Sequence, residues 1–374
     1  MLHCSFSVRW FLIAALAASV LVGPAATVSA APNQPARTLA PSGTATPAPI
    51  TVPTWSGSFA SAGASYPYTM VGGDPAAGSL TLVPVQIVPL RFKYANGVVL
   101  DGSDRVRDLL ASPLFAPAQF DSGFTQYGDA MLRANFWQTV SASSPRWHVL
   151  LAPEVLPTQT IDVPADRGRE FVGPTRGEQI GQMDEAWLDP QLEQLLTTAH
   201  TDPRAFVVFL THNSTPLLSG LCCDVGYHNV TQTTGPGGRT ELRTWMFGSY
   251  IDDGTYGGVN NDSGAIFSSD FRDVNIIAHE VVEWLEDPFT DNPVPSYQVL
   301  TGDPSLYNQF FGCSTNLEVG DPIVGSSFAV RSITGQTYHL PDAANIAFFS
   351  RGPSTSLHNR YSYLGQLSGP STPC

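Results

Sequence analysis

Charged residues are scarce in this sequence, and basic residues are the scarcer kind. Only 13% of the 374 residues are charged, and 32 acidic against 18 basic residues give a formal net charge of −14. Such a charge repels the phosphates of nucleic acids and the head groups of anionic lipids. We therefore expect no nucleic-acid partner.

The sequence also lacks the patterns that define several classes of protein. There is no C-x-x-C spacing, which argues against a zinc-thiolate cluster, and no G-x-S-x-G, so that a Ser-His-Asp hydrolase is not supported. No internal repeat is visible. Beyond residue 30, no apolar segment approaches the roughly 20 residues of a membrane-spanning helix. We expect no stable membrane span once the N-terminal segment is removed.

Three segments of different composition indicate the domain organisation. Residues 1–30 combine Arg9, an apolar run and the small residues Val28-Ser29-Ala30, which predicts a secretory signal peptide. Residues 31–54 are mostly Ala, Pro, Thr and Ser and predict a disordered spacer. Residues 55–374 can form one large globular domain, or two packed lobes. We expect the mature protein to be secreted or extracytoplasmic.

Four cysteines remain after the predicted cleavage: Cys222, Cys223, Cys313 and Cys374. An even number in an oxidising compartment predicts two disulfide bonds. Because a disulfide between the adjacent Cys222 and Cys223 would be strained, we expect each of these two to pair with Cys313 or Cys374.

Alternating strand and helix patterns predict an α/β fold with a mixed sheet. Helices are predicted over about 125–137 and from an Asp189-Pro190 start to 199. The second half of the chain is rich in loops around one strong helix, an arrangement in which loops commonly carry function. Pro84 and Pro89 interrupt the apolar segment 80–92, which predicts one or two strands with an edge or a bend. The other strand candidates are 147–151, 205–210, 242–250 and 328–333.

The strong helix is predicted to begin near Asp270, with Asp273 in an acidic first turn, and to end at Asp287-Pro288. At about 100° per residue its apolar residues cover one broad face, and other apolar residues flank the polar side. We therefore expect a helix that is covered on more than one side.

The polar strip of this helix has the pattern H-E-x-x-E. His279, Glu283 and Glu286 lie on one side of the helix, with Glu280 beside them. A His and a Glu at i and i+4 can bind one metal ion, and the Glu after the His can take a proton from metal-bound water, as in H-E-x-x-H zinc hydrolases. A carboxylate is a permissible zinc ligand that also suits harder ions. The alternative is a helix with an ordinary charged face.

Two other segments carry residues that could complete such a site. Glu318-Val319-Gly320-Asp321 lies in a loop-like stretch and could supply a third ligand or orient His279. Upstream, Gly226-Tyr227-His228 places a histidine in a Gly-rich loop. His228 could be a ligand, a group that polarises the substrate, or a histidine hydrogen-bonded in the core.

Two further kinds of site are weaker candidates. Asp252-Asp253-Gly254 and residues 260–264 are dense in oxygen ligands that could hold calcium, although they match no calcium-loop pattern. A glycosidase would use two carboxylates, Glu280 with Glu283 or Asp321. That interpretation leaves His279 without a role.

The three blocks together resemble a known family. The helix A-H-E-V-V-E-W-L-E-D-P is similar to the S-H-E-x-A-E-x-x-T-D-P helix of bacterial secreted proteins related to the phosphate-induced, Exordium-like family, in which a G-Y-H loop precedes the helix and an E-x-G-D segment follows it. The matching residues are Gly226-Tyr227-His228, His279-Glu280, Glu283, Asp287-Pro288, Glu318 and Gly320-Asp321.

These observations predict a secreted metal-dependent hydrolase that is peptidase-like and acts on an extracellular protein or a cell-wall substrate. Zinc would be held by His279, Glu283 and a residue of the Glu318 and Asp321 segment, with Glu280 as general base. We expect a zincin-like arrangement of a mixed sheet around the metal-site helix. The alternative is a non-catalytic extracellular or cell-envelope protein, in which the same strip is a structural metal or hydrogen-bond site.

Overall fold

A computed structural model of the chain describes residues 48–173, 177–218, 221–222, 225–255, 271–298 and 313–374. The predicted signal peptide and most of the predicted spacer lie outside the described residues. Residues 47–374 form one compact unit. Near the start of this unit, Ile50 makes a β-bridge with Glu241, and the first strand begins at Thr54.

A sheet of seven strands is the largest among the described residues. Its central strand β3 runs parallel to β7, β8 and β11, and β11 runs parallel to β15. Two strands pair antiparallel, β4 with β3 and β14 with β15, so that β14 forms one end of the sheet. The strands are β14 (Gly226–Thr234), β15 (Thr240–Tyr250), β11 (Phe206–His212), β3 (Leu80–Tyr94), β4 (Val99–Asp101), β7 (His148–Val155) and β8 (Gln159–Val163).

Smaller sheets and short helices surround this frame. The four-stranded sheet contains β13 (Leu221–Cys222), β12 (Ser214–Leu218), β10 (Gln179–Asp184) and β9 (Gly168–Val172). Two-stranded pairs are β1 (Thr54–Ser61) with β2 (Ala64–Val71), β5 (Ala118–Phe120) with β6 (Gly123–Thr125), β16 (Pro293–Gln298) with β17 (Cys313–Asn316), and β18 (Ser327–Arg331) with β19 (Thr337–Pro341). The α-helices are α1 (Val106–Leu110), α2 (Tyr127–Asn135), α3 (Trp137–Ala142), α4 (Glu185–Thr198), α5 (Asn275–Glu286) and α6 (Ile346–Ser350).

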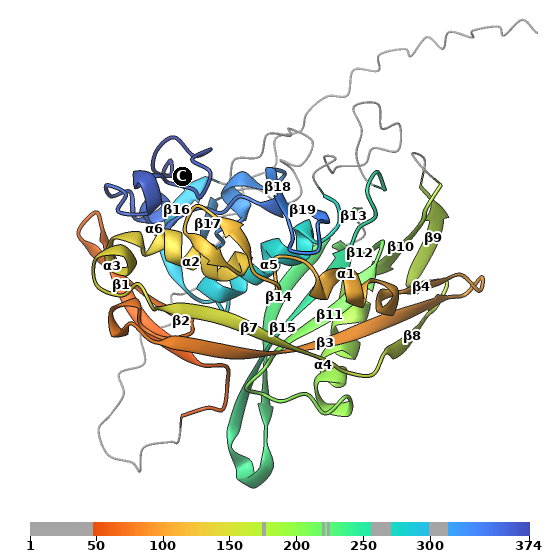
Figure 1. The fold of residues 1–374 in the computed structure, drawn as a ribbon. Helices are drawn as coiled ribbons and strands as arrows, with labels where there is room; N and C mark the ends of the chain where they lie inside the picture. The colour runs from red at the N-terminus through yellow and green to blue at the C-terminus, as the bar shows by residue number, and fades with distance from the viewer. Residues whose placement is uncertain (1–47, 174–176, 219–220, 223–224, 256–270, 299–312) are drawn as a thin grey trace, which may run out of the picture. The chain divides into compact units, whose positions relative to one another are not determined.

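Helices cover both faces of the seven-stranded sheet (Figure 1). Side chains alternate along β11, because successive residues of a strand point to opposite faces. Phe206 and Val208 belong to the core that α2 and α5 complete, whereas Val207 and Phe209 pack with the leucines of α4. The predicted α/β class with a mixed sheet is therefore confirmed.

The long strand β3 keeps its two prolines without breaking. Pro84 precedes the first residue of β3 that pairs with β11, and Pro89 falls between the segments that pair with β7 and β8. Each proline thus has a neighbouring strand on one side only, where a missing N–H is tolerated. Of the expected one or two strands, the structure has one.

Two predicted helices have different bounds. Helix α4 begins at Glu185, because the side chain of Asp184 caps it by accepting a hydrogen bond from the Trp187 N–H at 3.3 Å. Pro190 therefore lies inside the helix, and Asp189 does not cap it. The helix expected over 125–137 is two helices, α2 and α3, that meet at Phe136.

The expected disulfide pairing is wrong. Cys313 pairs with Cys374, with their Cα atoms 5.7 Å apart, so neither is available to Cys222 or Cys223. Backbone pairing explains the choice, because the Gln298 N–H donates to the Thr372 carbonyl at 3.1 Å and thereby places the C-terminal segment beside β16 and β17. Cys223 lies outside the described residues.

None of the described helices is both long enough and apolar enough to cross a membrane.

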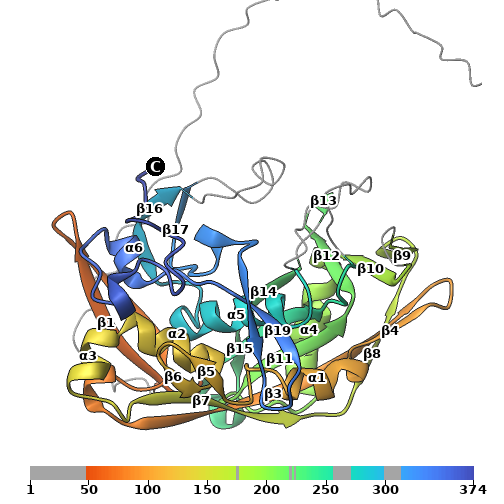
Figure 2. The same cartoon turned by 45° about the horizontal axis from the view of Figure 1, so that its top comes forward.

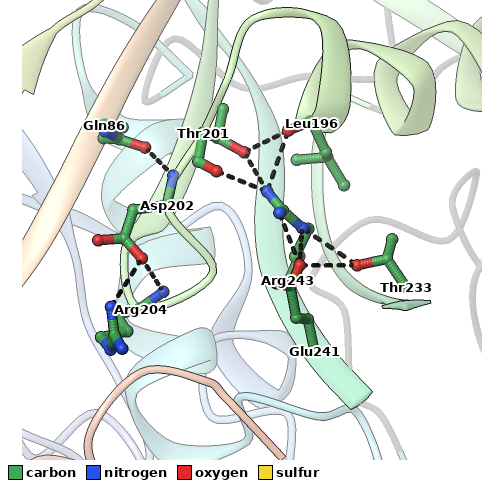
Figure 3. A network of polar contacts seen from close by, with 8 residues as sticks. All are labelled: Gln86, Leu196, Thr201, Asp202, Arg204, Thr233, Glu241 and Arg243. Atoms are coloured by element: carbon green, nitrogen blue, oxygen red, sulfur yellow. Dashed lines mark hydrogen bonds and ion pairs between the residues drawn. The ribbon is translucent and has the colours of Figure 1, made fainter. Parts of the chain in front are cut away.

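A buried arginine joins the end of α4 to the sheet (Figure 3). The guanidinium of Arg243 on β15 donates to the Leu196 carbonyl at 3.0 Å and to the Thr201 carbonyl at 2.6 Å. It also pairs with Glu241 at 2.7 Å, and both side chains of this pair are nearly inaccessible to solvent. A cation at the carbonyl end of a helix is favourable, and this one also satisfies carbonyls that the helix leaves free.

We predict that Arg243→Ala lowers the free energy of unfolding by about 3–5 kcal/mol, because it leaves the carboxylate of Glu241 buried without its partner. Urea unfolding measures the change. Arg204→Ala is the matched control, since Arg204 contacts Asp202 at 3.8 Å on the surface, and it should change stability by less than about 0.5 kcal/mol. Equal effects of the two substitutions would show that the buried network does not hold α4.

Candidate functional site

All residues of helix α5 except His279 are buried, so the expected cover on more than one side is confirmed. It lies between the sheet and the β18–β19 hairpin (Figure 2). Trp284 stacks on Phe206 of β11 with ring centroids 3.7 Å apart. The helix begins at Asn275, five residues later than predicted, because Asp273 has a positive φ of 45° and its carboxylate bonds to the ring of His339 at 2.7 Å. Asp273 therefore precedes the helix.

Glycines allow α5 to lie directly against the end of the sheet. Gly226 on β14 pairs with Gly248 on β15. A Cβ atom on Gly226 would lie 2.6 Å from Ile276 Cγ2 and 3.1 Å from Glu280 Cγ, and one on Gly248 would lie 3.0 Å from a side-chain carbon of Ile277. The G-Y-H segment is thus a strand rather than a loop, and it places His228 on the α5 side of the sheet.

One set of side chains combines α5 with the segment after it. His279 Nε2 lies 3.2 Å from Glu283 Oε1 and 3.6 Å from Asp321 Oδ1. One potential ligand atom from each residue lies within 4.8 Å of the others. The structure therefore brings together three of the four candidate metal ligands, with Asp321 rather than Glu318 as the third member of this set.

A second set uses the other carboxylate oxygen of Glu283. His228 Nδ1 lies 3.3 Å from Glu280 Oε2 and 4.0 Å from Glu283 Oε2. These three residues also place one potential ligand atom each within 4.8 Å of the others. Glu283 is thus shared by both sets, and Glu280 contacts His228.

The backbone of the E-x-G-D segment holds Glu283 in place. The N–H groups of Gly320 and Asp321 donate to Glu283 Oε1 at 3.0 and 3.3 Å. Gly320 is required here, because a Cβ atom at this position would lie 2.4 Å from His279 Cε1. Glu318 belongs to neither set of three, although its charge acts on both His228 and Glu283.

Acidic groups outnumber basic groups in this cluster. Four carboxylates, those of Glu280, Glu283, Glu318 and Asp321, surround two imidazoles, and none of the described lysines or arginines forms an ion pair with them. Burial raises the pKa of the Glu283 and Glu318 carboxyls, and in Glu318 the nearby charge of Glu283 raises it further.

The pKa values of the imidazoles are raised as well, although burial acts on them in the opposite direction. Burial alone would lower the pKa of His228, but its hydrogen bond with Glu280 and the surrounding carboxylates raise that pKa to about 10. The pKa of His279 is also raised well above its ordinary value, against the effect of burial, chiefly by Glu283 and Asp321. The carboxylates of the cluster therefore favour positive charge at these positions.

Solvent reaches the two sets unequally. The side chain of Asp321 is 38% exposed and that of His279 is 12% exposed, whereas that of His228 is only 4% exposed. The set that contains Asp321 is therefore the more accessible of the two.

Glu286, the third acidic residue of the predicted strip, points elsewhere. Its carboxylate accepts a hydrogen bond from the Asn135 side chain on α2 at 2.9 Å, and it belongs to neither set. Asp287 ends the helix and accepts hydrogen bonds from the backbone N–H groups of Asp291 and Asn292. Glu286 and Asp287 therefore form hydrogen bonds at the C-terminal end of α5 and do not contribute to either set.

The described half of the predicted calcium segment is already bonded. Asp252 pairs with Arg105 at 2.5 Å and with His212 at 2.9 Å, and Asp253 pairs with Arg272 at 3.0 Å. Residues 260–264 lie outside the described residues.

One residue near this cluster, Tyr297, is not among the residues predicted from the sequence. Tyr297 on β16 is fully buried, and its hydroxyl makes no hydrogen bond of good geometry with the described residues. Burial raises its pKa, the charge of Asp321 raises it further, and the side chain of Ser314 lowers it. A single tyrosine in a strand carries no sequence pattern that would reveal this position.

We predict that Gly320→Ala destabilises the protein by about 1–3 kcal/mol, because the added methyl group overlaps the ring of His279. The backbone of Gly320 is helical, with φ −83° and ψ −35°, so alanine adds no backbone strain. Gly369→Ala is the control, since a Cβ atom there meets nothing within 4 Å. Thermal unfolding that cannot distinguish the two variants would contradict this close contact.

A pH-dependent prediction concerns Glu286, whose pKa burial raises from 4.5 to about 8. Between these pH values the unfolded chain releases this proton while the folded chain keeps it, so wild-type stability falls as pH rises. Glu286→Gln should remove this part of the slope. Urea midpoints measured from pH 4.5 to 8 check it, with the exposed Glu193→Gln as control. Parallel slopes for wild type and Glu286→Gln would contradict the prediction.

Comparisons of this chain with protein-family models, with curated proteins and with solved structures found no match. The proposal for its function therefore depends on the geometry of the site.

Proposed function

We propose that this protein is a secreted, metal-dependent hydrolase of peptidase-like activity, with a metal ion held by His279, Glu283 and Asp321. The observation that carries the proposal is the convergence of these three side chains. Two come from adjacent turns of α5, and the third comes from a segment 38 residues after Glu283.

The donor atoms suit a divalent transition metal. One imidazole nitrogen and two carboxylate oxygens form the kind of mixed set that binds zinc, and three protein ligands leave a position for water or substrate. Ligands of one zinc ion at about 2.0–2.2 Å lie within about 4 Å of one another, so small side-chain shifts from the observed spacing suffice. The excess of carboxylates favours a cation that would replace the protons now held by the imidazoles.

The remaining residues have roles that follow from their positions. A bound zinc ion would supply Lewis acidity toward a carbonyl group and lower the pKa of water. Glu280 follows His279 in the helix and is the proposed general base, with His228 holding its carboxylate at 3.3 Å. The exposed side of Asp321 admits the substrate. An extracellular protein or cell-wall component is the proposed substrate, consistent with the resemblance to the secreted Exordium-like family.

A second candidate function is favoured by one specific observation. Glu283 Oε1 already accepts two backbone N–H groups from Gly320 and Asp321. Those bonds would also be made by a purely structural carboxylate that fixes the loop to α5. The alternative is therefore a non-catalytic extracellular or envelope protein, in which the cluster is a hydrogen-bond or structural metal site.

Metal analysis of the purified protein separates these candidates. We predict at least one stoichiometric transition-metal ion per chain, and we predict that His279→Ala loses the ion from this set together with any hydrolysis of an unfolded protein substrate. A chelator should abolish hydrolysis, and added zinc should restore it. His358→Ala is the control, because this exposed histidine pairs with Asp121 and belongs to neither set of candidate ligands.

If the wild-type protein contains no metal and added zinc does not change its stability, the hydrogen-bond alternative stands. Bound metal without hydrolysis of protein or cell-wall substrates would favour the structural metal site.

A further inference from the structure

The two oxygens of Glu283 face two different histidines. Oε1 lies 3.2 Å from His279 Nε2, and Oε2 lies 4.0 Å from His228 Nδ1. The carboxylate therefore stands between two groups of donor atoms, each with one histidine and one further acidic residue. A carboxylate in this position can bind a different cation through each oxygen.

His228 does not behave as a histidine satisfied by the core. Its side chain is only 4% exposed, and Nδ1 faces Glu280 and Glu283. Its other nitrogen, Nε2, is buried without a hydrogen-bond partner among the described residues. Buried polar groups are normally bonded, so hydrogen bonds of the core do not hold this ring by both nitrogens, and the nitrogen that faces the carboxylates is Nδ1.

The cluster offers more donor groups than one ion would take. Two imidazoles and three carboxylates, those of Glu280, Glu283 and Asp321, fall into two overlapping sets of three, and Glu283 belongs to both. An ion held by His279, Glu283 and Asp321 leaves His228 and Glu280 as donors that it does not use.

We propose that the site binds a second divalent transition-metal ion through His228, Glu280 and Glu283, so that Glu283 bridges two ions. This inference rests on the proposed function for the first ion. Glu280 then acts as a ligand of the second ion rather than as the general base. Two ions bridged in this way typically lie about 3.5–4 Å apart and act together on one substrate.

The number of ions per chain tests the proposal directly. The full chain is stripped with a chelator, dialysed against Zn²⁺, and analysed for metal and for hydrolysis. Two ions per chain are expected. One ion with hydrolysis intact would overturn the second site and leave the proposed function standing. No bound ion would overturn both.

Variants assign each ion to its ligands. His228→Ala and Asp321→Asn should each reduce the count from two ions to one, and Glu283→Ala should affect both ions. Glu280→Gln keeps the size of the side chain and decides its role. If this variant loses one ion, Glu280 is a ligand. If it keeps both ions but no longer hydrolyses the substrate, Glu280 is the general base, and the proposed ligand set is overturned. His358→Ala should keep both ions.

The bridge itself has a signature that does not depend on activity or on variants. The wild-type chain loaded with Mn²⁺ should give the electron paramagnetic resonance spectrum of an exchange-coupled pair. A spectrum of isolated Mn²⁺ at a loading of two ions per chain would overturn the shared carboxylate.

Discussion

The arrangement of this protein depends on the burial of an acidic helix. Helix α5 carries His279, Glu280, Glu283 and Glu286, and three of these four belong to the buried residues of the protein, with only His279 slightly more accessible. Burying charged groups is costly unless they find partners. The surrounding segments supply those partners one at a time, with His228 from β14, Asn135 from α2, and the backbone of residues 320–321.

This constraint explains the positions of the glycines. A helix whose polar groups must contact the sheet on one side and a loop on the other has to approach both closely. Gly226 and Gly248 remove side chains from the sheet where α5 crosses it, and Gly320 removes one above the ring of His279. These glycines therefore set the distances between the donor atoms. Any side chain in their place would separate the segments that make the site.

Local sequence patterns predict the helix itself better than the segments that surround it. Strands β11 and β15 and the burial of α5 follow from local hydrophobic patterns, and so does the i to i+4 relation of His279 and Glu283. The contact between Glu280 and His228 does not, because it depends on which face of β14 meets α5. The predicted start of the helix was wrong for a related reason. Asp273 bonds to His339, which lies 66 residues away in the sequence, and it is therefore not part of the helix.

The disulfide of Cys313 and Cys374 bears on the site although it lies outside it. Cys313 begins β17, the strand that leads into the segment with Glu318 and Asp321. This segment contributes a carboxylate to a cluster already rich in carboxylates, so mutual repulsion opposes its approach. A covalent bond to the C-terminal segment, which is itself paired with β16 and held by Arg351 through the Ser371 carbonyl, limits how far it can retreat. The bond thus restrains the segment that carries Glu318 and Asp321, and a cation at the cluster would reverse the repulsion that this restraint opposes.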